Sequence, residues 1–186
     1  MKRLYAFDFD GTLTTADTLL VFIRYACGTW RFIVGFLLHS PLLVLMKLKL
    51  YPNYRAKQRI FAWYFRGMEL KTFDALCRQF AERNTCLIRP KAKALLERLF
   101  SEGESVCVVS ASIDNWVRPF FTNMAKNSRS NFCVLGTQVE TDDNGLLTGR
   151  FLTNNCYGAE KVERLCKQYH DLTVHRNDYV IEAFGD

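Results

Sequence analysis

Short apolar runs that favour β-strands alternate along this chain with segments whose apolar residues recur at helical spacing. The four strand-like runs are residues 3–9, "ESVCVVSAS" (104–112), "NFCVLGT" (131–137) and "YVIEAFG" (179–185). Strands that are separated by helices pair side by side in parallel, because a crossover must carry the chain back to the same edge of the sheet. The sequence therefore predicts a three-layer α/β fold with a Rossmann-like parallel sheet between helices.

A long block without any strand signal follows the first strand. Apolar residues keep helical spacing through residues 17–85, so we interpret this block as an all-helical cap that is inserted into the α/β core. The core then comprises residues 1–16 and 86–186, with a hairpin in "TQVETDDNGLLTGRFL" around the turn "DDNG".

One segment of this block, "FIVGFLLHSPLLVLM" (32–46), is strongly apolar. It is shorter than the ~20 residues of a bilayer span, and Gly35, His39, Ser40 and Pro41 interrupt it. We expect a helix–turn–helix whose apolar side is buried. A lipid-facing or interfacial surface, and hence a membrane-associated protein, remains the alternative.

Composition narrows the range of partners. The 186 residues are 49% hydrophobic, and 25 Lys and Arg against 19 Asp and Glu give a net charge of +6, which suits anionic partners. The densest basic cluster, Arg55, Lys57 and Arg59, fits a solvated helix face, so nucleic acid is not an expected partner. Seven cysteines without a C-x-x-C pair, and an N-terminus unlike a signal peptide, predict a cytoplasmic protein.

Two aspartates follow the first strand in "DFDGTLT". Asp8 and Asp10 stand at its carboxyl end, where parallel sheets bind ligands, and the "DGT" turn leaves backbone N–H groups free for an anion such as phosphate. Two carboxylates would repel a phosphate unless a cation lies between them. Their oxygen ligands suit a hard divalent ion, so the pair predicts a Mg²⁺ site.

Other predicted strand and helix ends carry groups that fit the same chemistry. Ser110 ends the second strand and offers a hydroxyl to a phosphoryl oxygen. Lys161 lies near the start of a helix, where its ammonium group and the positive helix end can face an anion. Asp186 follows the fourth strand as a further metal ligand.

In this order, "DFDGT", "VVSAS", "GAEK" and "FGD" make the chain resemble the haloacid dehalogenase-like hydrolase superfamily. The helical insertion resembles the C1-type cap of the subgroup that contains phosphoserine phosphatases. The resemblance implies a Mg²⁺-dependent phosphomonoester hydrolase that acts through an aspartyl-phosphate on a small phosphorylated metabolite. It also implies that the family's last motif continues beyond "GD", so we expect the C-terminal end of the core to be truncated here.

The resemblance further implies roles for individual residues. Asp8 is the nucleophile, Asp10 the general acid and then base, and Lys161 offsets negative charge. Mg²⁺ is held by the Asp8 carboxylate, the Asp10 backbone carbonyl and Asp186. Phosphoryl oxygens are bound by Ser110 and by the amides of Phe9, Gly11 and Ala111, and the Thr12 hydroxyl supports the loop.

Several alternatives stay open at this point. Asp8 and Asp10 could cap a turn, Ser110 could cap a helix, Lys161 could pair with Glu160 or Glu163, and Asp186 could be a flexible chain end. Asp17 could cap the first helix or contact substrate from the cap. The cap is rich in Phe, Leu, Trp and Tyr, which favours an apolar or bulky phosphomonoester over phosphoserine. A protein that binds phosphate without turnover is the other functional class.

Overall fold

The computed structural model describes residues 1–126, 128–154, 156 and 158–185. Its centre is a four-stranded sheet in the order β3-β2-β1-β6, formed by β1 (Lys2–Phe7), β2 (Ser105–Ile113), β3 (Phe132–Thr137) and β6 (Tyr179–Phe184). All three strand pairings are parallel. The strands therefore end at one common edge of the sheet.

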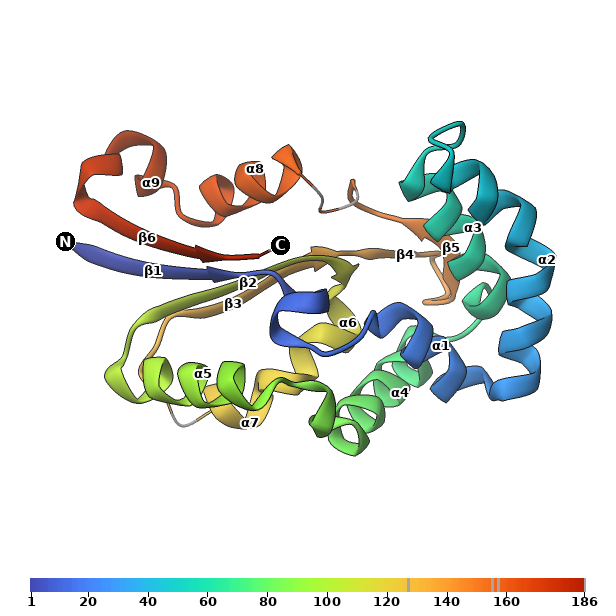
Figure 1. The fold of residues 1–186 in the computed structure, drawn as a ribbon, viewed down its shortest axis with the longest axis horizontal. Helices are drawn as coiled ribbons and strands as arrows, with labels where there is room; N and C mark the ends of the chain where they lie inside the picture. Colours follow the sequence, from blue (N-terminus) through green and yellow to red (C-terminus); the bar gives the residue numbers. More distant parts are fainter. Residues whose placement is uncertain (127, 155, 157, 186) are drawn as a thin grey trace.

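Helices cover both faces of this sheet (Figure 1). One face carries α5 (Pro90–Glu102), α6 (Asp114–Val117) and α7 (Thr122–Ala125), and the other carries α8 (Ala159–Gln168) and α9 (Asp171–Val174). Short helical turns span Thr85–Leu87, Arg118–Phe121 and Arg176–Asp178. The predicted three-layer α/β fold with a parallel sheet is confirmed.

Alternate strand residues supply the two cores. Tyr5, Val106 and Val108 pack toward α5 and the larger core, whereas Leu4 and Cys107 pack toward α8 and α9. This alternation follows from the pleat of a β-strand, which points successive side chains to opposite faces. Both faces are apolar because helices cover both, as a buried parallel sheet requires.

The helices of the predicted cap lie beyond the carboxyl ends of the strands (Figure 1). They are α1 (Thr18–Cys27), α2 (Thr29–Lys47), α3 (Asn53–Phe65) and α4 (Leu70–Arg83). Phe22 of α1 stacks on Trp116 of α6 with ring centroids 4.8 Å apart, so the larger core continues from these helices into the sheet layers. Aromatic contacts of this kind contribute a large share of the packing energy where they occur.

A hairpin joins the helices at this end. It consists of β4 (Val139–Thr141) and β5 (Leu147–Phe151), as the sequence predicted, and β5 packs on α3. Gly149 permits this close approach, since a Cβ at this position would lie 2.6 Å from the Cβ of Ala62. The Gln58 side chain accepts a hydrogen bond from the Phe151 amide at 3.1 Å. We call the part of the molecule formed by α1 to α4 the helical end. It includes, through this packing, a two-stranded element that the predicted all-helical cap lacked.

The segment predicted as a helix–turn–helix is instead one continuous helix, α2, which contains Pro41. Proline lacks the N–H group that would bond to the carbonyl of Leu37. The Ser40 hydroxyl donates to that carbonyl at 2.8 Å, so the helix passes the proline without leaving the acceptor unpaired. The expected burial is also wrong: of the residues in α2, Gly35 alone is buried.

Candidate active site

The predicted catalytic residues gather in a pocket of about 180 Å³ at the carboxyl edge of the sheet. The turn that follows β1 contributes Asp8 and Asp10, β2 contributes Ser110, and α8 contributes Lys161. The helical end closes the other side with Leu19 of α1 and with Asn53, Lys57 and Phe61 of α3. Ala111, Ser112, Ile113, Trp116, Phe151 and Asp17 complete the lining.

Asp8 stands where β1 ends, and two sides of its carboxylate are engaged. Its Oδ1 accepts a hydrogen bond from the Phe9 amide at 2.7 Å, and its Oδ2 lies 2.6 Å from Nζ of Lys161. Its own backbone N–H donates to the Phe184 carbonyl at 2.8 Å, which fixes it beside the end of β6. The alternative pairing of Lys161 with Glu160 or Glu163 is not among the ion pairs of the described residues.

Asp10 is held by three donors. The amide and the hydroxyl of Thr18 donate to its Oδ1 at 2.8 and 2.6 Å, and the Ser112 hydroxyl donates to its Oδ2 at 2.5 Å. Burial raises the pKa of Asp10 above its ordinary range, although these hydrogen bonds counteract the rise. A carboxyl group with a raised pKa that faces a pocket is suited to proton transfer.

The turn between the two aspartates shapes their approach. Gly11 has a φ of 78°, which a residue with a Cβ rarely adopts. Its carbonyl accepts a hydrogen bond from Arg89 at 2.9 Å. The Phe9 amide is occupied by Asp8 in this state, and the buried Thr12 hydroxyl has no hydrogen-bond partner among the described residues. The roles predicted for Phe9, Gly11 and Thr12 stay predictions.

The second strand differs slightly from the expectation. β2 continues to Ile113 rather than ending at Ser110, but its register with β3 shifts between Val109 and Ile113. The residues in this irregular stretch line the pocket, with Ser110 almost completely buried. The Ser110 hydroxyl accepts a hydrogen bond from the Ser112 amide at 3.0 Å, so it organises the strand end rather than capping a helix.

Two residues of the helical end add charge to the pocket. Asp17 caps α1, where its side chain accepts a hydrogen bond from the Leu19 amide at 3.0 Å, and it also lines the pocket, so both predicted roles are compatible. Lys57 lines the pocket as well, which corrects its assignment to a solvated face. Burial lowers the pKa of Lys57, and the carboxylates of Asp17, Asp10 and Asp8 oppose this.

Sequence reasoning missed Lys57 and Ser112 for identifiable reasons. Lys57 is one of three basic residues at alternate positions of a helix, and the fold alone decides which of them faces the sheet. Ser112 stands in "SAS" two residues after Ser110, so strand alternation could have placed both hydroxyls on one face.

The oxygen groups of the pocket fit a hard divalent cation. Mg²⁺ is usually held by one or two carboxylates together with water and substrate phosphate, which the Asp8 carboxylate and the Asp10 backbone carbonyl could satisfy. No group of three His, Cys, Asp or Glu side chains converges among the described residues. Asp186 lies outside them, but a Cβ at its neighbour Gly185 would lie 3.7 Å from the Cβ of Asp8.

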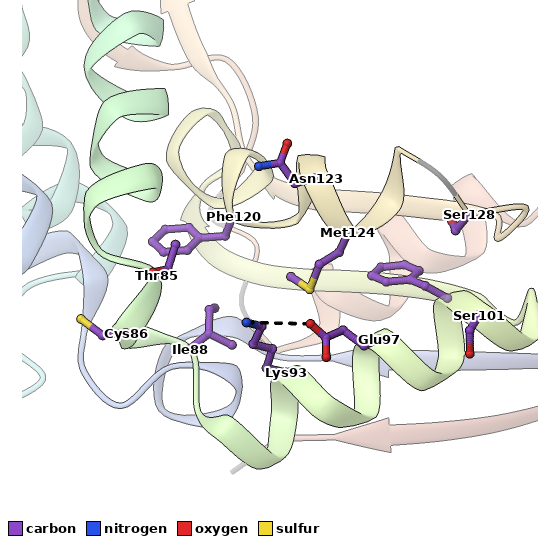
Figure 2. Close-up of a pocket in the computed structure, with 11 residues that line it drawn as sticks. Thr85, Cys86, Ile88, Lys93, Glu97, Ser101, Phe120, Asn123, Met124 and Ser128 are labelled. Carbon is purple, nitrogen blue, oxygen red and sulfur yellow. Dashed lines mark ion pairs between the residues drawn. The ribbon is translucent and has the colours of Figure 1, made fainter.

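A larger cavity of about 810 Å³ lies elsewhere, beside α5 and α7 (Figure 2). Its lining consists mostly of apolar side chains and uncharged polar ones. The two charged residues, Lys93 and Glu97 of α5, pair with each other, with Nζ 3.8 Å from Oε1. Its lining includes none of the predicted site residues. The smaller pocket is therefore the candidate active site, because convergent charged groups mark a reaction centre better than volume does.

The family model described as haloacid dehalogenase-like hydrolase matches residues 5–186. The chain belongs to the haloacid dehalogenase-like hydrolase family. It is also 32% identical over 166 residues to Protein CicA of Caulobacter vibrioides, a match that covers 87% of this chain and 70% of CicA. The predicted family is thus confirmed, and the chain is an enzyme of a hydrolase family.

Solved structures of other proteins share the fold. A protein of unknown function from Bordetella pertussis Tohama I superposes with a TM-score of 0.78 at 16% identity, over 98% of this chain and 80% of that one. A phosphoserine phosphatase solved with a phospho-aspartyl intermediate analogue superposes with a TM-score of 0.60 at 18% identity, over 98% and 78%. At such identities the likeness concerns the fold.

Proposed function

We propose that the chain is a Mg²⁺-dependent phosphomonoester hydrolase that works through an aspartyl-phosphate on Asp8. The observation that carries this proposal is that the two carboxylates of one pocket have different surroundings. Asp8 is paired with Lys161 at 2.6 Å, whereas Asp10 is buried, held by three donors and raised in pKa. Unequal surroundings of this kind give one carboxylate the role of nucleophile and the other that of acid and base.

In the first half-reaction a carboxylate oxygen of Asp8 attacks phosphorus, and the bond between phosphorus and the leaving oxygen breaks. Asp10 gives its proton to that oxygen, and the product alcohol departs. In the second half-reaction Asp10 takes a proton from water as the water oxygen attacks phosphorus, which releases phosphate and restores Asp8. Lys161 and Ser110 stabilise the charge on the phosphoryl oxygens throughout.

Mg²⁺, when bound by the Asp8 carboxylate and the Asp10 backbone carbonyl, with Asp186 as the third predicted ligand, neutralises charge between the carboxylates and the substrate. The substrate class follows from the pocket walls. Leu19, Phe61, Trp116 and Phe151 face the pocket beside the polar Asn53 and Lys57. A volume of about 180 Å³ suits a small phosphomonoester whose leaving alcohol has an apolar part.

The test is release of phosphate from p-nitrophenyl phosphate with and without Mg²⁺. We expect turnover that requires the metal and that falls at least ~10³-fold in Asp8→Asn, because this change removes the nucleophile. Glu163→Gln is the matched control, since it also removes one carboxylate, but from a residue of α8 that does not line the pocket. Binding of phosphate without any turnover by the unmodified chain contradicts the proposal.

A further inference from the structure

Helix α2 exposes an unusual amount of apolar surface. Five exposed apolar residues of α2 and Leu48, which directly follows the helix, have the spacing i, i+4, i+7, i+8, i+14 and i+18. At this spacing they form one stripe along the helix. We call this set the outer stripe: Trp30, Val34, Leu37, Leu38, Val44 and Leu48. Trp30 is 78% exposed and Leu37 is 65% exposed. A continuous apolar surface of this kind marks an interaction site.

The opposite side of α2 is packed against the rest of the molecule. The Tyr64 hydroxyl donates to the Phe32 carbonyl at 2.9 Å, and His39 and Trp63 meet with their ring centroids 6.0 Å apart. Gly35 permits this contact, since a Cβ there would lie 2.2 Å from the Tyr64 hydroxyl oxygen. The outer stripe therefore faces away from the protein. Figure 1 shows that α2 itself lies at the edge of the molecule.

The charge around the outer stripe has one sign. Residues 18–68 contain eight Lys or Arg and no Asp or Glu, so this part carries more than the net charge of the whole chain. Arg31, Lys47, Lys49, Arg55 and Arg59 are exposed, and among the described residues none of them takes part in an ion pair. Unpaired positive charge at the border of an apolar surface is complementary to an anionic one.

Aromatic residues stand at both ends of α2. Trp30 lies at its start, and Tyr51 and Tyr54 follow its end, where Arg59 lies 5.5 Å from the Tyr51 ring centroid and Arg55 lies 5.7 Å from that of Tyr54. Trp, Tyr and Arg prefer the boundary between lipid headgroups and acyl chains. We propose that α2 docks this protein on the surface of an anionic phospholipid bilayer, with the outer stripe immersed and the basic residues against the headgroups.

The chain connections favour a helix that lies along the bilayer rather than across it. By length and composition α2 could cross a membrane. However, α1 and α3 both pack on the protein body, and the link 48–52 has five residues. Such a link reaches at most about 18 Å, less than the ~30 Å of a hydrocarbon core, so α3 could not return to the same side.

Flotation of the full chain with lipid vesicles tests this docking without reading turnover. We expect the protein to float with vesicles of equal parts phosphatidylcholine and phosphatidylglycerol, and to float far less with phosphatidylcholine alone. The double variant Leu37→Glu/Leu38→Glu should lower the bound fraction at least ~10-fold, because two apolar anchors are lost. Val174→Glu is the control, since Val174 of α9 is an apolar residue at least as exposed as Leu37 and lies outside the stripe.

Charge variants separate the headgroup contribution and leave the stripe intact. Each of Lys47→Gln and Lys49→Gln should weaken binding to the anionic vesicles about fivefold. Both side chains are exposed, so we expect these variants to fold like the unmodified chain. Brominated lipid should quench Trp fluorescence in the unmodified chain. Trp30→Phe should remove most of that quenching, because Trp116 is buried and Trp63 is half-buried against His39 on the packed side of α2.

Three results overturn the proposal. The chain fails to float with anionic vesicles, or it floats equally with both vesicle types. Alternatively, it forms a dimer in lipid-free buffer that the Leu37→Glu/Leu38→Glu variant dissociates, which assigns the outer stripe to a second copy.

Discussion

At the scale of single residues, Lys57 shows how position on a helix decides function. It shares α3 with Arg55 and Arg59, which are exposed, yet it alone of these three lines the pocket. Its ammonium group adds positive charge opposite Asp8 and Asp10, and burial lowers its pKa. We interpret Lys57 as a group that binds the anionic substrate from the helical end.

Replacing Lys57 by Met should lower kcat/KM about 10- to 100-fold on a soluble phosphomonoester, because a charged hydrogen-bond donor is lost. Arg55→Met should leave it unchanged. The pKa of Lys57 is lowered from the ordinary lysine pKa of 10.5, so its ammonium group loses its proton at a lower pH than a free lysine does. The unmodified enzyme should therefore lose activity as the pH rises through that lower range. Steady-state pH profiles check this, and an identical alkaline limb in Lys57→Met contradicts it.

At the scale of elements, the contact between α3 and β5 ties the hairpin to the helices that close the pocket. Gly149 and Gly145 both have positive φ values, 84° and 75°, but a Cβ meets Ala62 at the first position and nothing within 4 Å at the second. Alanine at either position therefore strains the backbone, because both have a positive φ, and only Gly149→Ala adds a steric clash.

Gly149→Ala should lower the free energy of unfolding by about 1–3 kcal/mol more than Gly145→Ala does, measured by chemical denaturation. The difference reports on the close approach of β5 to α3, because both variants place a Cβ at a positive φ and only Gly149→Ala brings it against Ala62. Equal losses at the two positions would show that the hairpin does not need this contact.

Most elements were predictable because their signals are local. The strands, the helix after Pro90 and the "DDNG" hairpin follow from periodicity and turn residues. The continuity of α2 was not predictable, because proline usually ends or kinks a helix, and the hydrogen bond from Ser40 to the carbonyl that Pro41 leaves free is not visible in the sequence. Its exposure could not be predicted either, since an apolar segment in a sequence looks the same whether it faces a core or a partner.

At the scale of the whole molecule, the parallel sheet brings distant residues to one edge. Asp8, Ser110 and Lys161 were predicted as partners because parallel strands end together, and they line one pocket. The pocket wall from the helical end was less predictable. Its residues come from α1, α3 and the hairpin, whose packing on one another no local pattern specifies. The division into a core and a cap with the predicted boundaries stays a prediction.

The central claim is that Asp8 carries the phosphoryl group during turnover. Acid quenching during turnover with a phosphomonoester and Mg²⁺, followed by peptide mass spectrometry, measures this directly, because acyl phosphates survive brief acid treatment and are cleaved by hydroxylamine. We predict a hydroxylamine-sensitive phosphate adduct on the peptide that contains Asp8, absent in Asp8→Asn and present in Glu163→Gln. Turnover without any adduct on Asp8, or an adduct that persists in Asp8→Asn, would contradict the claim.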